Sequence, residues 1–220
     1  MFTKKELLWY KDLVYSKKIV IIFMMEVHDS FDNISKTDDY YIRKADYSSI
    51  DDLLLFHDLY CMKWNYLFNK EEVLKRFDEG HMCFAAFSKD KHEIVGFSWY
   101  AINSVYSRDL KCWFDINNIS TISYNTFVRE DFRGMSVQPS IRKQAFIDLK
   151  KSGVKDCFSY VSDKNQKMIR SIHKNNARVV GTVEYGYMLS KYYVNPKIPA
   201  DLGIRARLGS TDHFLVCFSN

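Results

Sequence analysis

The chain has 220 residues, 47% of them hydrophobic and 27% charged, so it can bury a substantial core and has the composition of a globular protein. Its 32 basic residues exceed the 27 acidic ones, which gives a formal net charge of +5. This charge is too small and too dispersed to indicate a nucleic-acid-binding protein, but it is compatible with an anionic ligand.

Five cysteines are widely spaced and form no C-x-x-C pair, which predicts unpaired thiols in a reducing compartment. They are Cys61, Cys83, Cys112, Cys157 and Cys217. The long aliphatic run from Ile19 to Met25 is much shorter than a membrane span, and it lacks the cleavage site of a signal peptide. We therefore expect a cytoplasmic protein without a membrane span, and no pattern of ligands predicts a metal site.

The first 39 residues are expected to form an extension that packs on the main domain. Thr3 and Glu6 are spaced as a capping box, which indicates a short helix to about Tyr15. The residues from Lys17 to Val27 then have the composition of a strand. A polar stretch from Asp29 to Asp39 indicates a loop.

The main domain is expected over residues 40–220. A strand from Tyr40 precedes a helix over about Ile50–Met62, and Asn69 is placed to cap a second helix that runs to Phe77. Two apolar runs on either side of a charged turn predict a hairpin. These runs are Met82–Phe87 and Glu93–Ile102, and Lys111–Ser120 is a further strand or a long loop.

A strand, a turn and a helix in the middle of the chain are the unit around which the rest is organised. The strand covers Ile122–Val128, and the turn reads Arg133-Gly134-Met135-Ser136-Val137. We expect Ser136 to cap the helix, and Gly153 to end it in the left-handed conformation. The apolar stripe of the helix consists of Val137, Ile141, Ala145 and Leu149. Such a turn points unpaired backbone N–H groups and the positive end of the helix dipole outward, which favours a phosphate.

A second strand and helix follow this unit. The strand covers Asp156–Val161, and Asn165 precedes a helix over Met168–Lys174. Asn176 suits a left-handed turn into the next strand. That strand covers Val179–Leu189, a last strand is expected over His213–Phe218, and Lys191–Gly209 is expected to be irregular.

The residues V-R-E-D-F-R-G-M-S-V, which run from Val128 to Val137, resemble the acyl-CoA-binding segment of the GNAT superfamily of N-acyltransferases. The matching positions are Val128, Phe132, Arg133 and Gly134. The two later glycines of the family's pattern are replaced by Ser136 and Gln138. The resemblance covers about residues 40–189 and depends on the order of elements more than on one motif.

The resemblance implies a GNAT-like α/β fold, with a mixed, mostly antiparallel sheet flanked by helices, and acetyl-CoA as the cofactor. The backbone of Thr126, Phe127 and Val128 would hold the pantetheine arm in the manner of an added strand. The amides of Gly134, Met135, Ser136 and Val137 would bind the diphosphate, and Arg133 would add positive charge. The side-chain amide of Asn165 would also bind the cofactor.

Catalytic side chains are harder to assign from the sequence. Many relatives place a glutamate on the central strand, where this chain has Thr121 and Ile122, and a tyrosine at the position of Ile172. The candidates that remain are Tyr124, whose side chain is expected on the same face as Thr126, and His173. Each also has a simpler interpretation, because Tyr124 could be a core aromatic residue and His173 a solvated surface residue. A proton path through solvent, without a dominant base, also stays open.

Three functions are considered. The first is an acetyltransferase that acts on the primary amine of a small molecule, with an amino-sugar nucleotide of surface-polysaccharide synthesis as one candidate substrate and a homodimer as one candidate assembly. The second is a GNAT-fold protein that binds a ligand without turnover. The third is an unrelated interaction or nucleic-acid-binding protein. The aromatic run Trp64–Phe68 could be a lid over the acceptor in the first case, a stacking platform in the third, or simply a packed turn.

Overall fold

The computed structural model describes residues 15–28, 39–61, 68–189 and 191–209. These residues form two compact units. One unit combines residues 26–102 with 118–157, and the other combines the described parts of residues 1–25, 103–117 and 158–220. The predicted helix before Tyr15, the loop at 29–38, the aromatic run at 64–67 and the last strand at 213–218 lie outside the described residues. The expected division at residue 39 stays a prediction.

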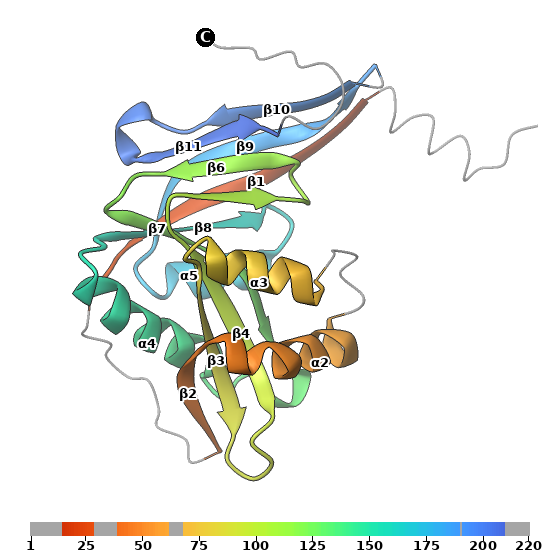
Figure 1. The fold of residues 1–220 in the computed structure, drawn as a ribbon. Helices are drawn as coiled ribbons and strands as arrows, with labels where there is room; N and C mark the ends of the chain where they lie inside the picture. The colour runs from red at the N-terminus through yellow and green to blue at the C-terminus, as the bar shows by residue number, and fades with distance from the viewer. Residues whose placement is uncertain (1–14, 29–38, 62–67, 190, 210–220) are drawn as a thin grey trace, which may run out of the picture. The chain divides into compact units, whose positions relative to one another are not determined.

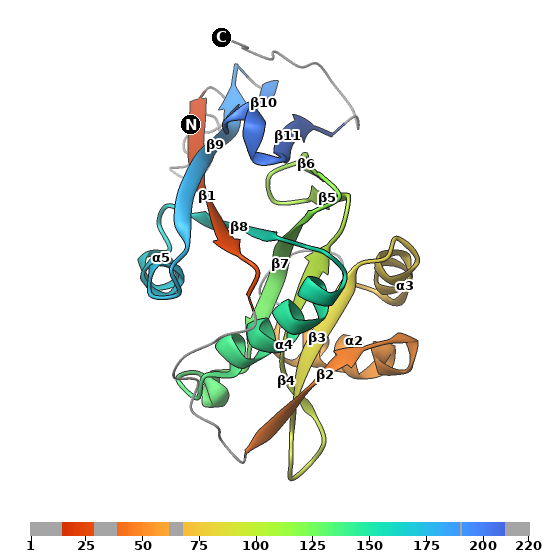
Figure 2. The same cartoon turned by 90° about the vertical axis from the view of Figure 1, so that its left-hand side faces the viewer.

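The unit that contains the central strand has an antiparallel sheet in the order β7-β4-β3-β2, which can be followed in Figure 2. The strands are β2 (Tyr40–Ala45), β3 (Met82–Ser88), β4 (Ile94–Ala101) and β7 (Ser120–Val128). The helices are α2 (Ile50–Tyr60), α3 (Lys70–Asp78) and α4 (Val137–Lys151), with short 3-10 turns η1 (Tyr47–Ser49) and η3 (Glu130–Phe132).

Both faces of this sheet are covered, which explains why β3 and β4 are buried along their whole length. Helix α4 covers one face, and α2 and α3 cover the other (Figure 1). The predicted apolar stripe of α4 is confirmed, because Val137, Ile141, Ala145 and Leu149 are all buried. The predicted hairpin of β3 and β4 is also confirmed, as are Asn69 as the cap of α3 and the left-handed Gly153.

The second unit has strands on both sides of β1 (Tyr15–Glu26). The order is β10-β9-β1-β8, with β9 antiparallel to both β1 and β10. These strands are β8 (Asp156–Ser162), β9 (Arg178–Met188) and β10 (Lys191–Lys197). Helix α5 (Gln166–His173) follows β8, and a separate sheet has the order β11-β6-β5. Its strands are β5 (Ser104–Ser107), β6 (Cys112–Ile116) and β11 (Ile204–Leu208), and the turn η4 (Ala200–Leu202) precedes β11.

The prediction that residues 191–209 are irregular was wrong, since they contain β10 and β11. Two prolines suggested the absence of strands, but Pro196 lies on β10, an edge strand of its sheet, where a missing N–H leaves no ladder bond unmade. Pro199 lies outside both strands and precedes the turn η4. The fold class predicted from the sequence, a mixed and mostly antiparallel α/β fold flanked by helices, is confirmed.

Candidate functional site

The turn between β7 and α4 has two residues with left-handed backbone. Gly134 has a φ of +87° and Ser136 a φ of +60°. A Cβ atom at Gly134 would meet nothing within 4 Å, so the space in front of this residue is open. The expected cap was wrong: the Ser136 side chain makes no capping hydrogen bond, because an N-cap side chain needs an extended backbone and Ser136 is left-handed. The first N–H groups of α4 therefore depend on partners other than this side chain.

Tyr40 on β2 anchors this turn through hydrogen bonds of its hydroxyl group. Its hydroxyl donates to the Met135 carbonyl at 3.0 Å and lies 2.9 Å from Ser140 Oγ on the first turn of α4. Tyr40 is itself buried, and these two bonds are partly buried. The sequence does not indicate this role, because no local pattern distinguishes a tyrosine whose partner lies 95 residues away.

The charges beside the turn are largely paired with one another. Arg133 Nη1 lies 2.8 Å from Glu130 Oε1, and Arg133 Nε donates to the Val128 carbonyl at 3.3 Å. Arg129 donates to both carboxylate oxygens of Asp131, and this lowers the pKa of Asp131. The Arg133–Glu130 ion pair is exposed, and an exposed pair contributes little to the free energy of folding. Arg133 could therefore leave Glu130 and bind a more highly charged anion with little loss of stability.

Strand β7 contains a β-bulge at Asn125. Trp99 is opposite Tyr124 and Phe97 is opposite Phe127, so Ser98 faces two residues of β7 instead of one. Asn125 has a φ of +47°, as the extra residue of such a bulge often does. The bulge breaks the alternation of side chains. Bulges are frequent next to active sites, where they redirect a side chain.

The bulge overturns the expectation that Tyr124 and Thr126 lie on the same face. Tyr124 is on the face of Trp99, toward α3, where the two rings are 6.4 Å apart. Thr126 is on the opposite face, where its Oγ1 lies 2.7 Å from Ser98 Oγ. In an unbroken strand, side chains alternate, so residues 124 and 126 would lie on the same face. No residue type in the sequence indicated the bulge.

The face of the sheet toward α3 holds a buried arginine among aromatic rings. The Arg76 guanidinium carbon lies 5.1 Å from the Tyr124 ring centroid and 5.2 Å from that of Trp99. Both Nε and Nη2 of Arg76 donate to Glu72 Oε1 at 3.2 Å. With the Asn125 amide turned so that its oxygen faces α3, this oxygen accepts from Arg76 at 3.2 Å. Arg76 therefore fixes the bulge and the Tyr124 ring at once.

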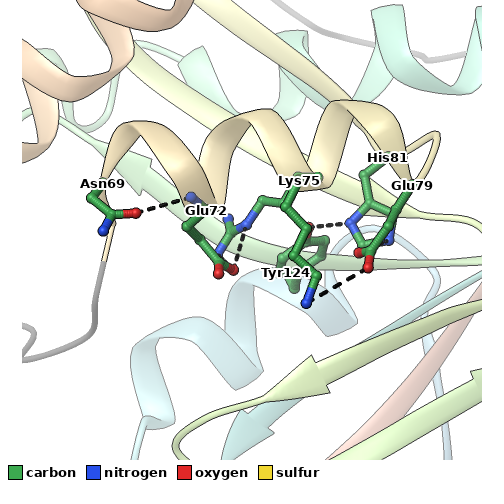
Figure 3. A network of polar contacts seen from close by, with 7 residues as sticks. Asn69, Glu72, Lys75, Glu79, His81 and Tyr124 are labelled. Carbon is green, nitrogen blue, oxygen red and sulfur yellow. Dashed lines mark hydrogen bonds and ion pairs between the residues drawn. The ribbon is translucent and has the colours of Figure 1, made fainter.

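His81 completes this network (Figure 3). Its Nδ1 lies 2.6 Å from the Tyr124 hydroxyl, and both side chains are buried. Its Nε2 is 3.9 Å from Glu79 Oε2, and the other oxygen of Glu79 is 3.8 Å from Lys75 Nζ. Neither Arg76 nor His81 was singled out from the sequence, because each reaches Tyr124 only through the packing of α3 on β7.

Asn165 and His173 belong to the other unit. Asn165 caps α5, since its side-chain oxygen accepts from the Met168 N–H at 3.1 Å. His173 is exposed and ends α5. Its ring meets the Phe23 ring edge-on, with 5.4 Å between the two ring centroids. Their roles toward a cofactor or in catalysis stay predictions.

Within the described residues, no group of three or more histidine, cysteine, aspartate or glutamate side chains could hold a metal ion. The helices of this part of the chain are also too short or too polar to cross a membrane.

The chain is similar in fold to several solved structures. A GCN5-related N-acetyltransferase from Sphaerobacter thermophilus matches with a TM-score of 0.56 and 11% identity, over 82% of this chain and 54% of that one. A Drosophila protein matches with a TM-score of 0.54 and 11% identity, over 85% and 57%. A conserved protein of unknown function from Staphylococcus epidermidis matches with a TM-score of 0.52 and 11% identity, over 84% and 66%.

No family model and no curated protein matches the sequence. The chain spans between 54% and 66% of the length of the three structures above. At this identity the likeness is one of fold. The chain therefore has a GNAT-like fold, which agrees with the resemblance found in its sequence.

Proposed function

We propose that the protein is an acyl-CoA-dependent N-acyltransferase, in the simplest case an acetyltransferase, that acts on the primary amine of a small molecule. The observation that carries this proposal is the turn between β7 and α4. Two left-handed residues, Gly134 and Ser136, present the start of a 15-residue helix, and Tyr40 holds the turn in place. The GNAT-like fold supports the same function.

The residues of the turn fit a diphosphate. The first N–H groups of a helix and the positive end of its dipole favour an anion, and the open space before Gly134 lets one approach the backbone. Ser136 has the backbone conformation of a glycine at a position where the family's pattern has glycine. Arg133 can add a charge-assisted bond once it leaves Glu130.

Bound acyl-CoA would supply a thioester that an amine can attack directly. The backbone of residues 126–128 would orient the pantetheine arm. Tyr124 is the catalytic candidate on β7. The amine has to lose a proton during the attack, so a group that accepts one nearby would accelerate the reaction.

A calorimetric titration with CoA and acetyl-CoA tests the binding step. Gly134→Ala should weaken binding about tenfold or more, because a Cβ enters the space before the turn and the left-handed backbone is strained. Gly153→Ala is the matched control, since Gly153 has a similar φ of +82° and equally open space at the other end of α4. Absence of binding by the native protein at millimolar CoA would refute the proposal.

A second candidate function is binding of CoA or a related ligand without turnover. The replacement of two glycines of the pattern by Ser136 and Gln138 favours it. Release of free thiol from acetyl-CoA with a panel of amines, including an amino-sugar nucleotide, distinguishes the two functions. Binding without thiol release for any amine would favour the second.

A further inference from the structure

Three ionisable side chains lie in series from β7 to the surface of the unit. The Tyr124 hydroxyl is 2.6 Å from His81 Nδ1, and His81 Nε2 is 3.9 Å from the Glu79 carboxylate. The His81 side chain is 3% exposed and that of Glu79 is 44% exposed. The series therefore runs from a buried phenol, through a buried imidazole, to a carboxylate in contact with water.

The local structure holds His81 in place. It lies between the end of α3 and the start of β3, and its backbone N–H donates to the Arg76 carbonyl at 2.9 Å. Its ring meets the Tyr124 ring edge-on, with 5.7 Å between the centroids. A short hydrogen bond between two groups that cannot move apart is suited to proton transfer.

The charges around the pair favour movement of a proton outward from Tyr124. The Arg76 cation lies above the Tyr124 ring and is paired with Glu72. Its positive charge favours a negative phenol oxygen on Tyr124. The Glu79 carboxylate, which faces Lys75, favours a positive imidazole. Strand β7 itself contains no aspartate or glutamate that could act as a base instead.

We propose that Tyr124 and His81 form a proton relay for the acyl transfer, an inference that rests on the function proposed above. As the amine nitrogen bonds to the carbonyl carbon, a nitrogen proton passes to the Tyr124 oxygen, directly or through one water. The phenol proton passes to His81 Nδ1. The carbon–sulfur bond breaks, the thiolate leaves and takes a proton from solvent, and His81 returns its proton to solvent beside Glu79. Tyr124 is the catalytic residue, and His81 is a positioning residue that acts through it.

Kinetics of the native protein and of two variants test the relay. Tyr124→Phe should lower kcat/KM about a hundredfold, and His81→Gln, which keeps a hydrogen-bonding side chain but does not titrate, at least about tenfold. The double variant should be no slower than Tyr124→Phe. His81→Gln should also remove the rise of kcat/KM with pH in the range where imidazoles titrate, while CoA affinity stays unchanged.

His57→Gln is the matched control, because His57 is another buried histidine of the same unit that lies beside a carboxylate, that of Asp58. This substitution should leave the pH profile unchanged. A His81→Gln variant with the native pH profile would overturn the relay even if its melting temperature fell, since a purely structural histidine would behave in that way.

A measurement without turnover separates the relay from the proposed function. In nitrogen NMR spectra, the titration of the His81 ring should shift when Tyr124 is replaced by phenylalanine, and the His57 ring should not respond. A shift in a protein that releases no thiol would support the proton coupling and refute the acyltransferase. An unchanged His81 titration would overturn the relay, whether or not the protein is an enzyme.

Discussion

Ser136 is a side-chain-bearing residue in a backbone conformation that glycine adopts without strain. At a φ of +60° a residue with a Cβ costs about 1–2 kcal/mol relative to a right-handed one. Ser136→Gly should therefore raise the free energy of unfolding by about 1 kcal/mol and strengthen CoA binding, because the turn no longer has a side chain before it. Urea unfolding and calorimetry measure the two effects. Ser136→Ala should improve neither, and weaker CoA binding in the glycine variant would argue against a phosphate at this turn.

Arg142 on α4 is buried, and among the described residues its Nη1 has no hydrogen-bond partner. Burial raises the pKa values of Tyr100 and Cys157, and the charge of Arg142 partly lowers them. Because a buried charged group with an unsatisfied nitrogen is costly, Arg142→Met should raise the free energy of unfolding by about 1 kcal/mol. Arg142→Ala should lower it, since a cavity remains. If the methionine variant unfolds at a lower urea concentration than the native protein, the guanidinium makes a stabilising interaction and the prediction is wrong.

Helix α4 and strand β2 together determine the turn that we assign to the cofactor. The Tyr40 hydroxyl bonds both Met135 and Ser140, so Tyr40→Phe leaves two polar groups without this partner. We expect CoA binding to weaken about tenfold with little change in the fold, as measured by calorimetry and circular dichroism. Tyr41→Phe on the same strand is the control, because the one hydrogen bond of the Tyr41 hydroxyl within the described residues is to the exposed His92. Equal CoA affinity in both variants would mean that the turn does not need this support.

The elements themselves followed from the sequence more reliably than their irregularities. The apolar spacing of α4 and the cap at Asn69 are local signals, and both were confirmed. The bulge at Asn125 was missed, because any polar residue can occupy such a position and the cause lies in the pairing of β7 with β4. That one extra residue moved Thr126 to the face opposite Tyr124 and changed the composition of the site.

At the scale of the whole molecule, the buried cysteines make the free energy of unfolding depend on pH. Four of them, Cys61, Cys83, Cys112 and Cys157, are buried and form no disulfide within the described residues, which agrees with the prediction of unpaired thiols, and Cys217 lies outside these residues. Burial raises the pKa of Cys112 and Cys157 from 9.0 to about 12. The folded state therefore keeps protons that the unfolded state loses above pH 9, and the free energy of unfolding should fall as pH rises from about 9 toward 12.

Thermal unfolding between pH 7 and 11 measures this effect, and Cys112→Val should flatten the dependence because one buried thiol is removed. A melting temperature that is constant over this range would contradict it.

A thiol reagent should also find five thiols per chain in denaturant without reductant. A stable count of three would reveal a disulfide.

The sequence by itself determined the order of most helices and strands, the apolar face of α4, the turn at residues 133–137 and the resemblance to the GNAT fold. These depend on short-range periodicity and on residues that favour caps and turns, which act within a few positions of the chain. Only the tertiary structure decided that Tyr40 supports this turn, that Tyr124 faces α3, and that Arg76 and His81 surround it. Contacts between residues 43 or 95 positions apart depend on how strands pair and helices pack, and no local pattern encodes them.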